Sequence, residues 1–126
     1  MKIEHVALYV EDLERAKDFF ETWFQATSSA KYHNPKRQFS SYFLSFDDGS
    51  RLELMHLPHL ADLSKENRTG LAHLCFSLGS KEAVNQLTHD LQEAGYSLVS
   101  GPRTTGDGYY ESCILDGEGN QIELTI

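Results

Sequence analysis

The sequence predicts an α+β fold built from two tandem β-α-β-β-β modules. The first observation is a repeated opening: residues 3–10 read Ile-Glu-His-Val-Ala-Leu-Tyr-Val, and residues 71–78 read Leu-Ala-His-Leu-Cys-Phe-Ser-Leu. Each run has a histidine at its third position, His5 or His73. The second observation is a repeated close, because each half ends on a strand-like run with a glutamate at its centre. Together they indicate a duplicated module.

The first module, about residues 1–57, opens with the strand 3–10, whose side chains alternate between two faces. Asp12 is a typical helix N-cap residue, and apolar residues recur at helical spacing up to about Phe24. The remaining predicted elements are, in order, a loop or weak edge strand over 28–37, a strand over 39–46, a hairpin turn over 47–50 and a strand over 51–55.

The second module, about residues 70–126, repeats this order after a predicted linker at about 58–69, which contains Pro58 and has no periodicity. Ser80 is a candidate N-cap and Gly95 a candidate C-terminal stop. The predicted elements are, in order, a strand over 71–78, a helix to about 94, a strand over 96–99, a loop over 101–108, a strand over 109–115, a turn over 116–120 and a strand over 121–126.

The composition is that of one globular domain. The chain has 126 residues, 40% of them hydrophobic and 24% charged, with a net charge of -8. The negative charge argues against a nucleic-acid partner, and no apolar run reaches the roughly 20 residues of a membrane span. The N-terminus enters a strand directly, so we expect no signal peptide. Cys75 and Cys113 lie in strand-like runs, which suggests a reducing cytoplasm and not a disulfide framework.

Strand alternation separates an apolar face from a polar face. In the first strand, Glu4 shares one face with Val6, Leu8 and Val10, and His5 lies on the other. The apolar residues that should pack under the two helices are Val6, Leu8, Val10, Leu52, Leu54, Ala72, Leu74, Phe76, Leu78, Ile122, Leu124 and Ile126. The opposite faces form a polar inner lining that holds His5, Tyr9, Arg51, Glu53, Met55, His73, Cys75, Ser77, Gln121, Glu123 and Thr125.

One histidine and one glutamate occupy matching places on this lining in both modules, His5 with Glu53 and His73 with Glu123. A duplicated module can bring four such side chains around one pseudo-twofold axis. Two neutral imidazoles and two carboxylates suit a borderline divalent cation such as Zn, Ni, Co, Mn or Fe(II). In octahedral geometry, four ligands leave two positions for water or a chelating substrate. Such an open site is typical of catalysis.

Three further motifs complete the pattern: Ile-Glu-His-Val-Ala followed by Asp12-Leu13, Gly70-Leu71-Ala72-His73, and Asp-Gly-Glu-Gly-Asn-Gln-Ile-Glu-Leu over 116–124. With these motifs the chain resembles the vicinal-oxygen-chelate superfamily. That superfamily includes glyoxalase I, bleomycin-resistance proteins, fosfomycin-resistance transferases, methylmalonyl-CoA epimerase and extradiol dioxygenases. The resemblance covers the whole chain and is closest to short bacterial glyoxalase I-like proteins. It implies a cupped mixed sheet with the helices on the outside, and a homodimer.

Within that superfamily, the ligand set resembles that of bacterial glyoxalase I, which uses His, Glu, His and Glu. The resemblance implies a lactoylglutathione lyase-like reaction on the hemithioacetal of methylglyoxal and glutathione. The metal would bind two adjacent substrate oxygens and stabilise an enediolate. A glutamate would remove a carbon proton and return it to the neighbouring carbon. By position, Glu123 is the expected principal base and Glu53 its counterpart, while His5 and His73 are fixed ligands.

The chain departs from glutathione-using members at two points. They carry an Arg four residues after the first His, where this chain has Tyr9, and an Asn shortly after the first Glu, which the run Leu54-Met55-His56-Leu57 lacks. Arg51, Arg37 and Arg103 are candidate replacements for these glutathione contacts. The full set of candidate substrate contacts is Tyr9, Arg51, Arg103, Tyr109 and Tyr110.

Two alternatives remain open at this stage. One is a metal-dependent dioxygenase or thiol transferase on the same fold, for which Glu53 is the discordant residue. The other is a small-molecule binding or resistance protein that needs no metal. In every case the partner is a small molecule. The sequence leaves open its identity, and whether the site forms within one chain or across a dimer interface.

Overall fold

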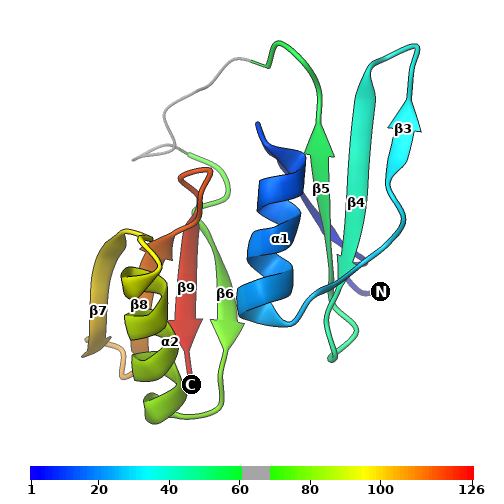
Figure 1. The fold of residues 1–126 in the computed structure, drawn as a ribbon. Coiled ribbons are helices and arrows are strands. Elements are labelled where there is room, and N and C mark those ends of the chain that lie inside the picture. Colours follow the sequence, from blue (N-terminus) through cyan, green and yellow to red (C-terminus); the bar gives the residue numbers. More distant parts are fainter. Residues whose placement is uncertain (61–68) are drawn as a thin grey trace. The chain divides into compact units, whose positions relative to one another are not determined.

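The computed structural model describes residues 1–60 and 69–126. The chain divides into two compact units, Met1–Leu63 and Ser64–Ile126, and in each a helix covers one face of a β-sheet (Figure 1). The predicted α+β class with two tandem modules is therefore confirmed. The predicted linker at about 58–69 lies mostly outside the described residues.

The first unit contains a mixed sheet in the order β1-β5-β4-β2, with β3 paired to β4. Its elements are β1 (Val6–Tyr9), α1 (Leu13–Phe24), β2 (Thr27–Ser28), β3 (Tyr32–Asn34), β4 (Phe39–Ser45) and β5 (Arg51–His56). The strand β1 runs parallel to β5, and the other pairs are antiparallel. The predicted edge segment over 28–37 thus contains β3 and the end of β2.

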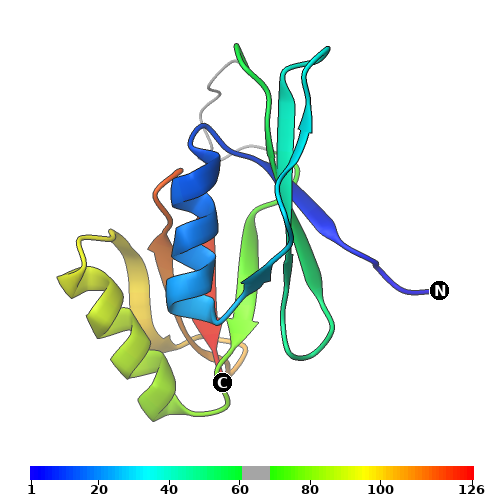
Figure 2. The same cartoon turned by 45° about the vertical axis from the view of Figure 1, so that its right-hand side comes forward.

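The second unit contains a mixed sheet in the order β6-β9-β8-β7. Its elements are β6 (His73–Ser77), α2 (Lys81–Glu93), β7 (Leu98–Thr104), β8 (Tyr110–Leu115) and β9 (Gln121–Thr125). The strand β6 runs parallel to β9, in the same relation as β1 to β5. The second unit therefore repeats the topology of the first around its own helix (Figure 2).

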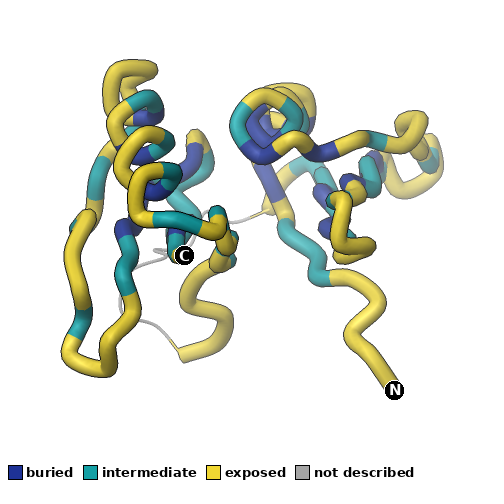
Figure 3. The backbone as a smooth tube through the Cα atoms, turned by 90° about the horizontal axis from the view of Figure 1, so that it is seen from below, coloured by how far each residue is buried: buried dark blue, intermediate teal, exposed yellow. Residues whose placement is uncertain are grey.

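Both helices begin at the predicted caps. The side chain of Asp12 accepts a hydrogen bond from the backbone N–H of Arg15, and the side chain of Ser80 accepts one from Ala83. Each helix packs against its own sheet, and Figure 3 marks the buried residues of helices and strands in dark blue along the backbone. The core of the first unit contains Leu13, Ala16, Phe19, Phe20, Phe24, Leu44, Leu52 and Leu54, and that of the second contains Val84, Leu91, Ile114, Ile122 and Leu124.

One buried polar contact joins helix and sheet in the second unit. The hydroxyls of Thr88 on α2 and Ser112 on β8 lie 2.6 Å apart, and the Thr88 hydroxyl also donates to the carbonyl of Val84. Both side chains are almost fully buried, so the pair satisfies groups that water cannot reach. It also shows that the Ser112 side of β8 faces the helix.

The strand β1 is shorter than the predicted 3–10, because it exists only where β5 pairs with it. The register joins Val6 to Leu52, and β5 begins one residue earlier, at Arg51. Residues 1–5 therefore precede the ladder. Two apolar positions also differ from expectation, since Ala72 and Ile126 are exposed.

The strand β7 begins later and extends further than the predicted 96–99, taking in part of the predicted loop over 101–108. Its pairing with β8 shifts register on both sides of Ser100. Gly101 has φ +83°, and a Cβ there would lie 2.4 Å from the carbonyl oxygen of Glu111. A glycine is thus required for the backbone of β7 to approach that of β8 this closely.

No helix among the described residues is both long enough and apolar enough to span a membrane.

Candidate functional site

In the first unit, His5 and Glu53 lie together on the sheet face opposite α1. Leu52 and Leu54 on β5 are buried in the core, so Glu53 between them points to the other face. His5 immediately precedes β1, and its Nε2 lies 3.8 Å from Oε2 of Glu53. The Glu53 side chain is 16% exposed and that of His5 is 36% exposed. The pair is accessible from solvent and close enough to share one ligand.

The second unit repeats this geometry with His73 and Glu123. Glu123 on β9 lies between the buried residues Ile122 and Leu124, so it also points away from its helix. His73 begins β6, and its Nε2 lies 3.6 Å from Oε2 of Glu123. The predicted repeat of one His and one Glu thus has the same local form in both units.

The surroundings of His5 include three further side chains. Its Nδ1 hydrogen-bonds to the carboxylate of Glu4, which also accepts from Nη1 of Arg51. The Arg51 guanidinium lies over the Phe43 ring, with Cζ 4.2 Å from the ring centroid. The imidazole meets the same ring edge-on, at 5.2 Å between centroids. The hydrogen bond from His5, followed by that from Arg51, lowers the pKa of Glu4.

The surroundings of Glu123 are different. The Cys75 thiol, directly opposite on β6, donates a hydrogen bond to Oε1 of Glu123 over 3.2 Å. Burial, and then the contact with this carboxylate, raises the pKa of Cys75 to about 12, so the thiol is protonated at neutral pH. Cys113 lies opposite Glu123 on the other neighbouring strand, and burial also raises the pKa of its thiol.

The donor set in each unit fits half of a divalent-metal site. Two ligands of one small divalent cation lie about 3 Å apart, given metal–ligand bonds of roughly 2.0–2.2 Å. The observed separations between Nε2 and Oε2, 3.8 Å and 3.6 Å, are slightly longer and can close by side-chain rotation. Within 1–60 and 69–126, His, Cys, Asp and Glu side chains form no group of three or more suited to a metal. Each unit thus offers two ligands.

The other candidate residues of the first unit lie on or beside the same face. Tyr9 pairs with Met55 in the register that pairs Ala7 with Glu53, so its side chain is on the Glu53 side of the sheet, where it is exposed. Arg51 is joined to Glu4 through its guanidinium.

In the second unit, Arg103 pairs with Glu111, which places it on the side of β8 that carries Cys113 and faces away from α2. Tyr109 is exposed just before β8. Tyr110 lies elsewhere: its hydroxyl donates to Asn85 Oδ1 on α2 over 2.7 Å. Tyr110 therefore sits on the helix side of the sheet, away from Glu123.

Sequence reasoning missed the contact of Glu4 with His5. Strict alternation placed Glu4 on the opposite face from His5, but both residues precede the first ladder pair of β1. Outside the ladder, adjacent side chains are free to turn toward each other. The signal available in the sequence was an acid next to a predicted metal-binding histidine, together with an arginine two residues before Glu53.

The sequence as a whole matches a family model and a curated protein. The model of the Glyoxalase/Bleomycin resistance protein/Dioxygenase superfamily matches residues 2–124. The uncharacterized protein YqjT of Bacillus subtilis (strain 168) is 31% identical over 127 residues, which cover 97% of this chain and 96% of that protein.

Solved structures of similar fold include three informative ones. A glyoxylase/bleomycin resistance protein/dioxygenase domain from Frankia sp. EAN1pec has a TM-score of 0.83 at 21% identity, covering 99% of this chain and 90% of that one. The trypanothione-dependent glyoxalase I of Leishmania major has 0.79 at 18%, covering 99% and 86%. The fosfomycin resistance protein FosX of Listeria monocytogenes, complexed with Mn(II) and sulfate, has 0.74 at 18%, covering 98% and 90%. At these identities the likeness is one of fold.

Proposed function

This chain belongs to the glyoxalase/bleomycin resistance protein/dioxygenase superfamily, and on that premise we propose that it is a divalent-metal-dependent lyase or isomerase of glyoxalase I type. Its substrate would be a small molecule with two adjacent oxygens, and the reaction a proton transfer through an enediolate. The leading named reaction is that of lactoylglutathione lyase. We place it in the cytoplasm, as a homodimer.

One observation carries this proposal, namely the repeated His–Glu pair. Each unit turns an imidazole Nε2 and a glutamate Oε2 toward each other on the sheet face opposite its helix. We propose that His5, Glu53, His73 and Glu123 together hold one metal ion, which is Zn, Ni, Co, Mn or Fe(II). The solved FosX structure, which is complexed with Mn(II), supports a metal on this fold.

The bound metal would supply Lewis-acid polarisation of the two substrate oxygens. His5 and His73 act as fixed ligands through Nε2, and Glu53 and Glu123 as carboxylate ligands. Glu123 takes the carbon proton and returns it to the neighbouring carbon, the general acid–base role. Its carboxylate suits that role because Cys75 holds Oε1 while Oε2 faces His73. Glu53 is its counterpart in the first unit.

The residues that would choose the substrate are the exposed groups near these pairs. We propose four residues as substrate contacts: Tyr9, Arg51, Arg103 and Tyr109. Tyr9 and Arg51 lie on or beside the Glu53 side of the first sheet, and Arg103 lies on the Glu123 side of the second. Tyr109 is exposed just before β8. Tyr110 remains a candidate from the sequence, although its hydroxyl is bonded to Asn85 on the helix side.

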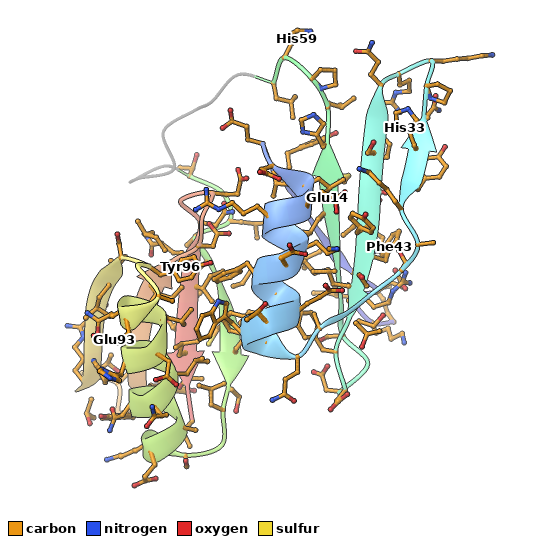
Figure 4. All side chains as sticks on the ribbon, in the orientation of Figure 1. Glu14, His33, Phe43, His59, Glu93 and Tyr96 are labelled. Carbon is orange, nitrogen blue, oxygen red and sulfur yellow. The ribbon has the colours of Figure 1, made fainter. Side chains whose placement is uncertain are left out.

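The experiment that tests the metal site is metal content after dialysis against trace divalent metals, followed by turnover. We expect about one metal per set of four ligands in the wild type and a loss in His5→Ala and Glu123→Ala. Glu123→Gln should lower kcat by about 10²-fold or more without changing the circular dichroism spectrum. His89→Ala and Glu93→Gln remove the same groups from exposed positions on α2 and should change neither metal content nor turnover. Figure 4 labels Glu93 on this helix.

A folded wild type that retains no metal would overturn this function and favour a metal-free binding protein. Unchanged turnover in Glu123→Gln would overturn the assignment of the base. Oxygen uptake, or transfer of glutathione to an electrophile, would instead identify the dioxygenase or thiol transferase alternative.

A further inference from the structure

We propose that Glu4 and Arg51 are positioning residues, which hold the His5 imidazole so that Nε2 faces Glu53 and is free to bind a metal. The proposal rests on the proposed function in one respect, the role of the His5–Glu53 pair as metal ligands. It goes further in making the two histidines unequal: Glu4 and Arg51 hold His5 in place, whereas among residues 1–60 and 69–126 no equivalent set of side chains holds His73.

The contacts of His5 form a chain of three links. Nδ1 of the ring bonds to Oε2 of Glu4, and Oε1 of the same carboxylate accepts from Nη1 of Arg51. The Arg51 guanidinium is in turn seated over the Phe43 ring, with Cζ 4.2 Å from the centroid. Because the rings of Phe43 and His5 also make a T-shaped contact, these interactions form a closed circuit from His5 through Glu4, Arg51 and Phe43 back to His5. The ring is thus restrained both at one nitrogen and along one edge.

This arrangement selects one tautomer of His5. A carboxylate accepts hydrogen bonds and cannot donate them when it is ionised, so the Nδ1 that it contacts must carry the proton. The neutral ring then presents a lone pair at Nε2, the atom 3.8 Å from Oε2 of Glu53. Metal-ligating histidines are commonly oriented by a carboxylate in this way, and loss of that partner costs about 10–100-fold in metal affinity.

The role of the chain is orientation more than stability. Glu4 is 53% exposed and Arg51 is 35% exposed, and an ion pair so open to solvent contributes little to the free energy of unfolding. A role in orienting His5 therefore predicts a change at the imidazole that is separable from any change in folding.

The second unit lacks these residues at every corresponding place. The register pairs His73 with Gln121, and Gln121 stands two residues before Glu123 as Arg51 stands two residues before Glu53. Ala72 precedes His73 as Glu4 precedes His5. Cys113 lies opposite Glu123 on β8, as Phe43 lies opposite Glu53 on β4. The variant Glu4→Ala consequently gives the first unit the residue that the second already has.

The first test needs no metal. Long-range proton–nitrogen NMR of the metal-free protein, at a pH where the histidines are neutral, reports which ring nitrogen carries the proton. We expect His5 to be protonated at Nδ1 in the wild type and to shift toward protonation at Nε2 in Glu4→Ala. In Glu4→Gln the side-chain amide can either accept from Nδ1–H or donate to Nδ1, so we expect an intermediate mixture of the two tautomers. The spectrum of His73 should be the same in all three proteins.

The second test is affinity for Mn(II), measured by titration of the whole chain. Glu4→Ala should weaken binding by about 10–100-fold, and Arg51→Gln, which copies Gln121, should weaken it by a smaller factor. Glu14→Ala is the matched control. It removes another exposed carboxylate of the same unit, one paired with Lys31 and not with His5 (Figure 4), and should bind Mn(II) as the wild type does.

The two tests separate the failure of this inference from that of the proposed function. If the wild type binds no Mn(II), Zn(II), Ni(II), Co(II) or Fe(II), the proposed metal site fails, while the tautomer of His5 still reports on Glu4. If Glu4→Ala leaves the His5 tautomer unchanged, the positioning role is overturned. Equal Mn(II) affinity in Glu4→Ala and Glu14→Ala would overturn its consequence for metal binding.

Discussion

At the scale of single residues, the two glutamates of the repeat have different neighbours. Glu53 lies between Ala7 and Phe43 across the strands, neither of which offers a side-chain hydrogen bond. Glu123 lies between Cys75 and Cys113, and accepts from the Cys75 thiol. The repeat therefore preserves the His and Glu residue types, while the neighbouring residues distinguish the two carboxylates. This difference is the reason that we propose unequal roles for Glu123 and Glu53.

The state of the Cys75 thiol gives a direct prediction. Burial and the adjacent carboxylate raise its pKa to about 12, and the thiolate is the reactive form. In the metal-free native protein, iodoacetamide at pH 8 should therefore alkylate Cys75 at least about tenfold more slowly than in the unfolded chain. Mass spectrometry of peptides reports both cysteines separately. Equal rates in the folded and unfolded chain would contradict the raised pKa.

At the scale of elements, strand ends decide which side chains meet. The ladder of β1 starts at Val6, so Glu4 and His5 are not bound by alternation and their side chains come together. In β7, the close approach of the backbone at Gly101 to β8 accompanies a shift in the pairing register of the two strands. This close approach lies two residues before Arg103, the candidate substrate-contacting residue that pairs with Glu111.

Replacement of Gly101 tests this close approach of β7 to β8. In Gly101→Ala the new Cβ would lie 2.4 Å from a carbonyl oxygen, at a positive φ that disfavours alanine. We expect a loss of about 1–3 kcal/mol in the free energy of unfolding, measured by urea denaturation. Gly106→Ala is the control, because a Cβ there meets nothing within 4 Å, and it should change stability by no more than about 0.5 kcal/mol. Equal stability of the two variants would refute the close approach.

At the scale of the whole molecule, several exposed carboxyls share one electrostatic behaviour. Hydrogen bonds in the folded chain lower their pKa values. The groups, with their principal donors, are Glu4 with His5, Glu14 with Lys31, Asp48 with Ser50 and Asp107 with Thr105. A carboxyl with a lowered pKa binds fewer protons in the folded chain than in the unfolded chain around its ordinary pKa, so protonation favours unfolding.

The free energy of unfolding should accordingly fall as the pH is lowered from about 5 to about 3, the range in which unfolded carboxyls take up protons. Urea denaturation at a series of pH values measures this slope. Since the groups are exposed, added salt should reduce it. The substitution Glu14→Ala should reduce the slope as well. Stability that stays constant or rises on acidification would contradict this expectation.

Much of the architecture follows from local sequence patterns. Alternating apolar residues predict which side of each strand faces the helix, and Leu52, Leu54, Ile122 and Leu124 are all buried as that pattern requires. Asp12 and Ser80 determine where the helices begin, because each caps backbone N–H groups only three residues away. The same alternation places Glu53, His73 and Glu123 on the polar faces. Such features depend on neighbours in the chain, which a sequence displays directly.

Other features were decided only by tertiary structure. The start of β1 depends on where β5 begins. Because Glu4 and His5 precede that start, their side chains can turn toward each other. The register of β6 against β9 brings Cys75 opposite Glu123. Two shifts in the register between β7 and β8 allow β7 to extend into the segment that the sequence predicted as a loop. Each depends on how one strand pairs with another, so the local sequence pattern is the same whether or not the contact forms. The sequence by itself thus determined the repeated His and Glu residues, while the folded sheets decided which side chains contact each of them.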